Sequence, residues 1–217
     1  MRVLILGGTG NVGVRLIEAA LAEKHTIVVY ARAPKSLPAH IATHRDVVVI
    51  QGQLTEEDAL SKAMEGVQIV LSALGPSPAL HPGGTPLAKG YRVVLRLMEH
   101  HRVRRIILLG SPSMKDERDK PTVVFTAARA SVQAIARNAY KEMVAIGKVI
   151  NEAPEGIDWT IVRVSRLMNG ERREVVAGYL GEGKIGTAVT RAGFAAFVME
   201  EIQKQQWTRQ RPLICTP

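Results

Sequence analysis

The sequence has a single cysteine, Cys215, and aromatic residues make up only 4% of its 217 residues. One cysteine forms no intrachain disulfide, and no Cys/His spacing typical of a zinc site is present. Disulfide scaffolds and zinc domains are therefore excluded. We expect no metal site and a reducing compartment, the cytoplasm. With so few aromatic side chains, the core must consist mainly of Val, Ile, Leu, Ala and Met.

Long apolar runs are also lacking. No run approaches the roughly 20 residues that cross a bilayer, so no membrane-spanning segment is expected. The apolar stretch 3–6 ends in glycines and is too short for the core of a secretion signal.

The chain carries a formal net charge of +9. This charge can indicate an anionic partner, or it can be an ordinary basic surface. Basic residues are scattered apart from the clusters 102–105 and 209–211, and few aromatic rings are available to stack on bases. Nucleic-acid binding is therefore not expected. The oligomeric state stays open.

Short apolar runs alternate with longer segments of helical periodicity. The runs are apolar throughout rather than alternating, which is typical of parallel strands covered on both faces. The alternation predicts an α/β fold with a doubly wound parallel sheet, built as one domain over 1–217. The expected strands are 3–6, 26–30, 47–50, 69–72, 106–109 and 160–164.

The helical segments fall between these strands. Val12, Leu16 and Ala20 form the apolar stripe of a first helix. Thr55 opens a second, with Asp58 three residues later as a capping pair. Further helices are expected over 86–101, over 127–152 with an interruption or end near Gly147, and over 192–204. Two loops are expected: a Pro-rich one over 76–86 and a charged, solvated one over 111–121.

A glycine-rich turn, Gly7-x-x-Gly10-x-x-Gly13, lies directly after the first strand and before the first helix. Glycine permits the tight turn, lets the backbone approach a pyrophosphate and lets helix and strand pack closely. The helix N-terminus then offers free N–H groups to the phosphates. A turn that merely joins strand and helix is the disfavoured alternative. The pattern predicts a Rossmann-type dinucleotide site, with cofactor contacts from Gly7, Thr9, Gly10, Asn11 and Val12.

The end of the second strand indicates the kind of dinucleotide. NAD-binding proteins usually place an Asp or Glu there for the ribose 2′-hydroxyl. This sequence has no carboxylate at that point and continues instead with Arg32 and Lys35. Both cations can bind a 2′-phosphate, and Arg can do so with two parallel hydrogen bonds. NADP(H) is therefore favoured, although two solvated loop cations remain an alternative.

The glycine turn, Arg32, and the segment from Lys148 through Glu152 to Arg163 together resemble the atypical short-chain dehydrogenase/reductases. The most similar group is that of the NmrA-like and flavin (biliverdin) reductase B-like proteins. The resemblance covers most of the chain and implies an NADP(H)-dependent enzyme. It implies further cofactor contacts from Gln53, Leu54, Ala73, Leu74, Gly75, Lys148 and Val164, and catalytic or substrate-orienting roles for Ser111 and Lys148.

The chain departs from the family pattern at the proton donor. The main short-chain dehydrogenases use Tyr-x-x-x-Lys, in which the Lys lowers the pKa of the Tyr. Four residues before Lys148 stands Val144, and Tyr140 lies a further helical turn away. The Arg-x-Asp before the last helix appears as Arg191-Ala192-Gly193. No acid catalyst is therefore evident.

Several residues keep two interpretations. Ser111 can be a catalytic group or a loop serine that caps a turn, and Lys148 can be a solvated helix lysine. His81 can reach the mouth of the site, although a surface position is favoured. Met114 and Met168 can line an apolar substrate pocket or pack locally. Glu142 and Glu152 are expected to be solvated.

Three functions remain open. The first is an NADP(H)-dependent oxidoreductase for a small apolar or aromatic substrate of flavin, quinone or carbonyl type. Its proton comes from Ser111, from the substrate or from water. The second is a non-catalytic NADP(H) sensor that controls a partner protein. The third is a non-redox enzyme, such as an isomerase or dehydratase, on the same scaffold, because fold does not fix function.

Overall fold

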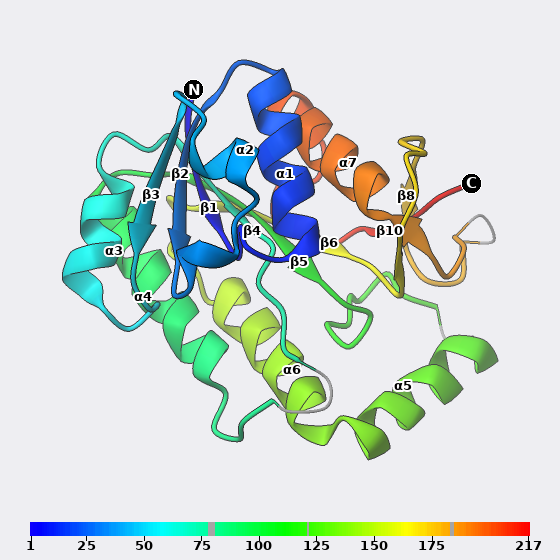
Figure 1. Ribbon diagram of the computed structural model, residues 1–217. Coiled ribbons are helices and arrows are strands. Elements are labelled where there is room, and N and C mark those ends of the chain that lie inside the picture. The colour runs from blue at the N-terminus through cyan, green and yellow to red at the C-terminus, as the bar shows by residue number, and fades with distance from the viewer. Residues whose placement is uncertain (78–80, 121, 183–184) are drawn as a thin grey trace.

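A central sheet of eight strands organises the chain, as the computed structural model shows (Figure 1). The structure describes residues 1–77, 81–120, 122–182 and 185–217. The strand order is β3-β2-β1-β4-β5-β6-β10-β8, and its first six members have the order of a Rossmann fold. The strands are β1 (Arg2–Leu6), β2 (Thr26–Ala31), β3 (Val47–Gln51), β4 (Ile69–Ser72), β5 (Arg105–Gly110), β6 (Asp158–Arg163), β8 (Val176–Gly178) and β10 (Leu213–Cys215).

The six strands expected from the sequence are confirmed, with ends that shift by at most two residues. All pair in parallel, and their interior residues are almost fully buried except in the outer strand β3. β10 joins β6 in parallel and β8 joins β10 antiparallel. β7 (Leu167–Met168) and β9 (Val189–Thr190) form a separate parallel pair. The pattern did not indicate these four short strands.

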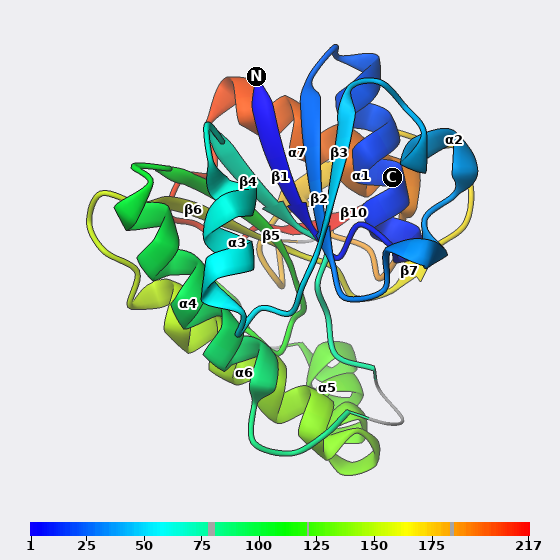
Figure 2. The ribbon, with the colours of Figure 1, turned by 60° about the vertical axis from the view of Figure 1, so that its left-hand side comes forward.

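Helices cover both faces of the sheet (Figures 1 and 2). On one face lie α1 (Asn11–Ala22), α7 (Arg191–Lys204) and the short α2 (Ala39–Ala42), and on the other α3 (Glu57–Met64), α4 (Pro86–His100) and α6 (Arg137–Asn151). Each layer buries its own apolar cluster against the sheet. α5 (Val123–Ile135) extends beyond this body next to α6, and the turn η1 (Pro34–Ser36) follows β2.

Two helix predictions are wrong. The helical stretch expected over 127–152, with an interruption or end near Gly147, forms α5 and α6, and the break between them is at Ala136 (φ −121°, ψ 49°). Gly147 lies inside α6, where a Cβ atom would be 3.1 Å from Met114, so packing against Met114 explains the glycine. Thr55 does not cap a helix: α3 begins at Glu57 after Glu56, without a side-chain cap.

No helix among the described residues is both long enough and apolar enough to pass through a membrane.

Candidate functional site: the carboxyl edge of the sheet

The carboxyl ends of the parallel strands meet at one edge of the sheet, at the bottom of Figure 1. Gly7 follows β1 with a φ of +76°, a conformation that favours glycine. A Cβ atom at Gly7 would be 3.0 Å from Ala73 C and Leu74 N, so the turn lies against the backbone that follows β4. The two segments predicted to contact a dinucleotide are thus adjacent.

Gly13 lets α1 approach this turn. A Cβ atom there would be 2.1 Å from the Gly7 carbonyl oxygen and 2.6 Å from Gly8 Cα, so no larger residue fits without a backbone shift. The Gly10 N–H donates to the Gly7 carbonyl at 3.1 Å and closes the turn. Three predicted cofactor residues stand here: Thr9 is partly buried, Asn11 is exposed and Val12 is buried.

The N-terminus of α1 is open to an anion. Its N-cap is Gly10, no side chain caps it, and its first turn contains no acidic residue. The first N–H groups of a helix lack partners within the helix, and the helix dipole favours negative charge there. A pyrophosphate fits this opening in shape and charge.

Tyr30, near the end of β2, positions the loop after β3. Its hydroxyl donates to the Gln53 carbonyl at 2.8 Å and lies where a Cβ of Gly52 would be only 2.2 Å away. Burial, aided by the charge of Glu56, raises the pKa of Tyr30 to about 12, so the hydroxyl stays protonated at neutral pH. Gln53 is exposed and Leu54 partly buried, so both are available at this edge.

Arg32 and Lys35 follow β2 at the same edge. Both side chains are exposed, and neither forms an ion pair with a carboxylate in the described part of the chain. The Arg32 carbonyl accepts a hydrogen bond from Gln51 Nε2 at 3.3 Å, which ties the loop backbone to β3. The two cations are thus held near the sheet by the backbone while their charged groups stay unpaired.

The segment after β4 is held by a buried pair of hydroxyls. Ser72 Oγ is 2.6 Å from Tyr91 Oη and accepts from the Leu74 N–H at 3.3 Å. The Ala73 N–H donates to the Leu6 carbonyl at 2.9 Å. Ala73 and Leu74 are partly buried and Gly75 is exposed. The sequence analysis missed Ser72 and Tyr91, because only the fold brings them together.

Ser111 lies directly after β5. Its Oγ accepts from the Ser113 N–H at 3.3 Å, and its carbonyl accepts from the Met114 N–H at 3.0 Å. Ser111 therefore caps a turn, and its hydroxyl donates to no group in the described part of the chain, so the hydrogen can be given to a ligand. After β6, Val164 is buried and its N–H donates to the Gly110 carbonyl at 3.1 Å.

Lys148 lies on the solvent side of α6. Its side chain is 76% exposed, and its ammonium is 4.0 Å from a Glu152 carboxylate oxygen. The preceding residue, Gly147, packs on buried Met114, and consecutive helix residues point about 100° apart. This is the position of a solvated helix lysine, so a role for Lys148 at the cofactor stays a prediction. Val144, at the missing tyrosine position, is also 41% exposed.

The loop 111–121 was expected to be solvated, and this is wrong for its aspartates. Arg163 is fully buried and donates to both carboxylate oxygens of Asp119, at 2.6 and 2.8 Å. Arg118 binds Asp116 at 2.8 Å and stacks over the Tyr179 ring at 4.1 Å. Arg163 Nε also donates to the Arg211 carbonyl at 2.6 Å. These pairs tie the loop to β6 and to the chain around β8 and β10.

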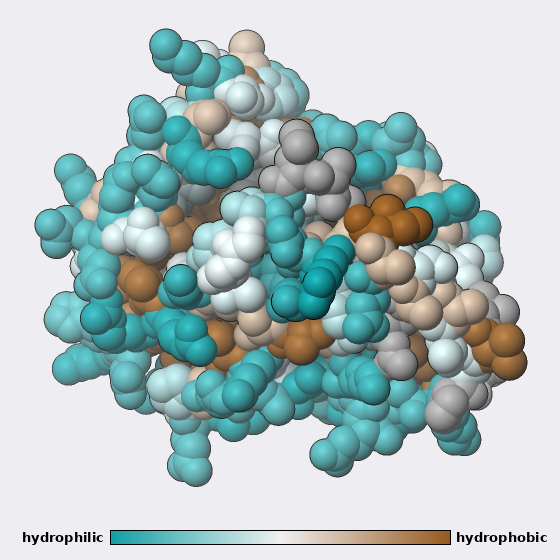
Figure 3. Space-filling view, turned by 90° about the horizontal axis from the view of Figure 1, so that it is seen from below, coloured by the Kyte–Doolittle hydropathy of each residue, from teal (hydrophilic) through white to brown (hydrophobic). Residues whose placement is uncertain are grey.

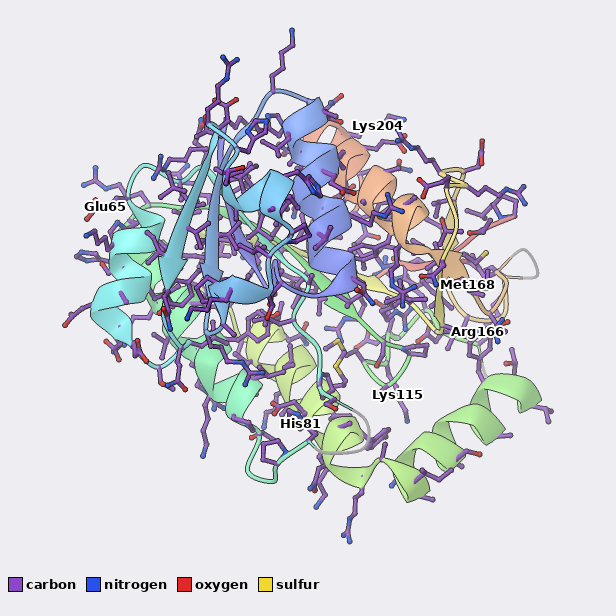
Figure 4. The ribbon with its side chains drawn as sticks, in the orientation of Figure 1. Glu65, His81, Lys115, Arg166, Met168 and Lys204 are labelled. Carbon is purple, nitrogen blue, oxygen red and sulfur yellow. The ribbon has the colours of Figure 1, made fainter. Side chains whose placement is uncertain are left out.

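The solvated position expected for Glu142 is also wrong, as is the surface position favoured for His81. Glu142 is fully buried, lies 2.6 Å from His81 Nε2 and accepts from the N–H groups of Leu87 and Ala88 at 3.2 and 2.9 Å. The Glu142 carboxylate thus caps α4 from α6, and the His81 side chain is only 8% exposed. Figure 4 shows His81 beside the start of α6.

The arrangement offers an open helix N-terminus, two unpaired cations and a serine along one edge. Figure 3 looks onto this side and shows apolar residues interrupting a mostly hydrophilic face. A long ligand with phosphates and a flat apolar end suits such an edge. Within the described ranges, no three His, Cys, Asp or Glu side chains are grouped closely enough to hold a metal ion.

A family model described as NAD(P)H-binding matches residues 7–205. The chain is 32% identical over 91 residues to a 3 beta-hydroxysteroid dehydrogenase/Delta 5-->4-isomerase of Mycobacterium tuberculosis. This match covers 42% of the chain and 23% of the relative, so the chain spans about a quarter of the length of this curated relative.

Two solved structures share the fold over the whole chain. A short-chain dehydrogenases/reductase (wide type) from Veillonella parvula, in complex with NADP, has a TM-score of 0.81 at 17% identity, covering 100% of this chain and 94% of that one. An anaerobillin reductase from Escherichia coli O157:H7 has a TM-score of 0.76 at 20% identity, covering 100% and 98%. At these identities the likeness concerns the fold.

Proposed function

The chain belongs to the family of NAD(P)H-binding proteins, and on this premise we propose that it is a cytoplasmic NADP(H)-dependent oxidoreductase. Its substrate is a small apolar or aromatic molecule of flavin, quinone or carbonyl type. The observation that carries the proposal is the uncapped N-terminus of α1 at the glycine turn, with unpaired Arg32 and Lys35 at the same edge.

The preference for NADP(H) over NAD(H) rests on charge. A 2′-phosphate brings additional negative charge, and the end of β2 presents two exposed cations and no carboxylate. Arg32 can bind the phosphate with two hydrogen bonds, whereas a ribose hydroxyl would leave its charge uncompensated. The NADP in the Veillonella parvula structure agrees with this preference.

When bound, the nicotinamide cofactor supplies a hydride, and the protein supplies binding, orientation and a dry surface. The first turn of α1 and Arg32 would hold the phosphates, while Ala73 and Leu74 would shape the adjoining wall. Ser111 can donate its free hydroxyl hydrogen to an acceptor oxygen. Because no tyrosine stands at position 144, acceptors whose reduced forms take protons from water suit the site better than simple ketones.

A spectrophotometric assay tests the proposal. We expect NADPH absorbance at 340 nm to fall when the protein is mixed with flavin mononucleotide, menadione or an aromatic aldehyde. Ser111→Ala should lower kcat, and Arg32→Ala should raise the KM for NADPH. Arg45→Ala is the matched control, because Arg45 is a 92% exposed cation at the opposite end of β3. NADPH binding without turnover on any acceptor would contradict the proposed oxidoreductase activity.

That contrary result would favour the second candidate, an NADP(H) sensor. One feature of the sequence supports it: counting back four residues from Lys148, as in the Tyr-x-x-x-Lys pattern, gives Val144, which cannot donate a proton. A sensor would need NADP(H) binding and a partner protein but no acceptor. A chain that binds neither NADPH nor NADH would contradict both candidates.

A further inference from the structure

A pocket lies directly beyond Ser111, between the loop after β5 and the start of α5. Its volume is about 210 Å³, and Leu180, which follows β8, also lines it. Pro112, Phe125 and Leu180 give it an apolar wall, and Lys115, Lys120 and Thr122 give it a polar rim. Figure 4 shows Lys115 on this side of the molecule, between the sheet and α5. Since Pro112 follows Ser111, a ligand in the pocket would have one end next to the proposed reaction site.

The carboxylates of this pocket are already neutralised. Asp119 is bound on both oxygens by Arg163, and Asp116 is bound by Arg118 at 2.8 Å. Burial alone would raise the pKa of each aspartate, but hydrogen bonds from these arginines and from backbone N–H groups outweigh it and hold the pKa below its ordinary value. Both aspartates are therefore ionised at neutral pH, and the charge of each is compensated by an arginine.

The two lysines of the rim differ from the arginines in forming no ion pair within the described ranges. Lys115 and Lys120 are exposed, and neither ammonium pairs with a carboxylate anywhere in the described ranges. Thr122 Oγ accepts from the Phe125 N–H at 3.3 Å, and within the described ranges its hydroxyl donates to no protein group. The rim thus offers hydrogen-bond donors and positive charge next to an apolar wall, while the two carboxylates of the pocket are bound by arginines.

From this arrangement we propose that the pocket binds the carboxylate of an amphipathic acid. The carboxylate lies between Lys115 and Lys120, and the apolar body lies against Phe125 and Leu180. On the proposed function, this makes the substrate an apolar or aromatic carboxylic acid. A phosphate is disfavoured, because the arginine forks that suit it best are already engaged by Asp116 and Asp119.

Binding of 2-naphthoate, compared with uncharged 2-naphthamide, tests the pocket without any turnover. We expect isothermal titration on the full chain with NADP⁺ bound to give about tenfold tighter binding of the acid, the effect of a charged hydrogen bond. The double variant Lys115→Ala/Lys120→Ala should lose this tenfold preference and keep its affinity for the amide. Lys115→Arg/Lys120→Arg should retain it.

The double variant Lys62→Ala/Lys89→Ala is the matched control, since it removes two exposed lysines from α3 and α4. It should keep the preference for the acid. Equal binding of acid and amide would overturn the proposal, as would a preference that survives the loss of Lys115 and Lys120. Acid binding that NADP⁺ displaces would also overturn it, because the acid would then occupy the dinucleotide site.

Different results would contradict the acid-binding pocket and the proposed oxidoreductase activity. An acid preference carried by the two lysines, without NADPH oxidation on any acceptor, would contradict the oxidoreductase and leave the acid site intact. Turnover with equal KM values for the acid and amide forms of an acceptor would contradict the acid site and leave the oxidoreductase intact.

Discussion

At the glycine turn the chain is held by backbone sterics, whereas beyond Ser111 it is held by ion pairs between distant residues. Gly7 and Gly13 leave room for other backbone atoms, and no charged side chain shapes the turn. Asp119, in the loop after β5, pairs with the buried Arg163 of β6, which is 44 residues away in the sequence. The glycine turn and the loop after β5 therefore differ in which substitutions would disrupt their structure.

This difference separates two kinds of robustness. Steric contacts between backbone atoms do not depend on pH or salt, so the glycine turn should keep its shape wherever the fold survives. A buried ion pair resists salt but fails when either partner is removed or neutralised, because the remaining charge is then uncompensated.

The largest effect on dinucleotide binding should come from Gly13→Ala. The new Cβ would be 2.1 Å from the Gly7 carbonyl oxygen, so α1 must move away from the turn. We expect NADPH affinity to fall by at least about 100-fold and the free energy of unfolding by about 1–3 kcal/mol. Fluorescence titration and urea unfolding measure the two effects. Gly156→Ala, where a Cβ meets open space, should change neither, and near-normal NADPH binding by Gly13→Ala would refute the steric account.

Asp119→Ala should produce the opposite pattern. It leaves the fully buried Arg163 guanidinium without its carboxylate, and we expect the free energy of unfolding to fall by about 3–5 kcal/mol. The NADPH affinity of the folded fraction should stay within about twofold. Asp46→Ala removes an exposed partner of Arg45 and should cost less than about 1 kcal/mol in urea unfolding. A small loss in the free energy of unfolding for Asp119→Ala would show that the fold does not need the Arg163–Asp119 ion pair.

Arg32→Ala tests the charge at the glycine-turn half. Loss of a charged hydrogen bond to a 2′-phosphate should weaken NADPH binding by about 10- to 100-fold and leave NADH binding nearly unchanged. Fluorescence titration with both dinucleotides measures the ratio. Arg45→Ala should leave the ratio as it is. An equal loss for NADH would mean that Arg32 contacts a part common to both dinucleotides.

The smallest effect concerns pH. Arg163 and nearby N–H groups hold the pKa of Asp119 below its ordinary value, so the stabilisation is fully present above the unfolded pKa of about 3.9. It is lost as the pH falls through the lower, folded pKa. Urea unfolding should therefore show a steeper loss of stability below about pH 4 for the unaltered protein than for Asp119→Asn. Parallel curves would contradict this linkage.

The sequence could predict the parts of the fold that depend on neighbours along the chain. Six apolar runs and a glycine turn between strand and helix suffice for β1–β6 and for the start of α1. The strands β8 and β10 are three residues long and occur beside polar segments, so no run marks them. The break between α5 and α6 at Ala136 likewise could not be predicted, because no glycine or proline stands there.

Burial of charge was the least predictable property. Glu142 lies in α6 on the same face as the buried Ala139, Met143 and Ile146, so the helical spacing places it facing inward, but it does not name the groups that bind the carboxylate. Its burial depends on His81 and on two N–H groups of α4, 54 to 61 residues away. The aspartates of the loop after β5 were missed for the same reason, since their arginine partners come mostly from other strands and loops.

The contact of Gly7 with Ala73 and Leu74 has a consequence for the order of folding. β1 lies between β2 and β4, so the wall behind the glycine turn is absent until the fourth strand has been added. Pairing over such a separation is slow, because the loop must close before any contact forms. A chain emerging from the ribosome would thus carry the complete glycine motif long before it could bind a dinucleotide. Dinucleotide binding would then mark the docking of β4 rather than the synthesis of the motif.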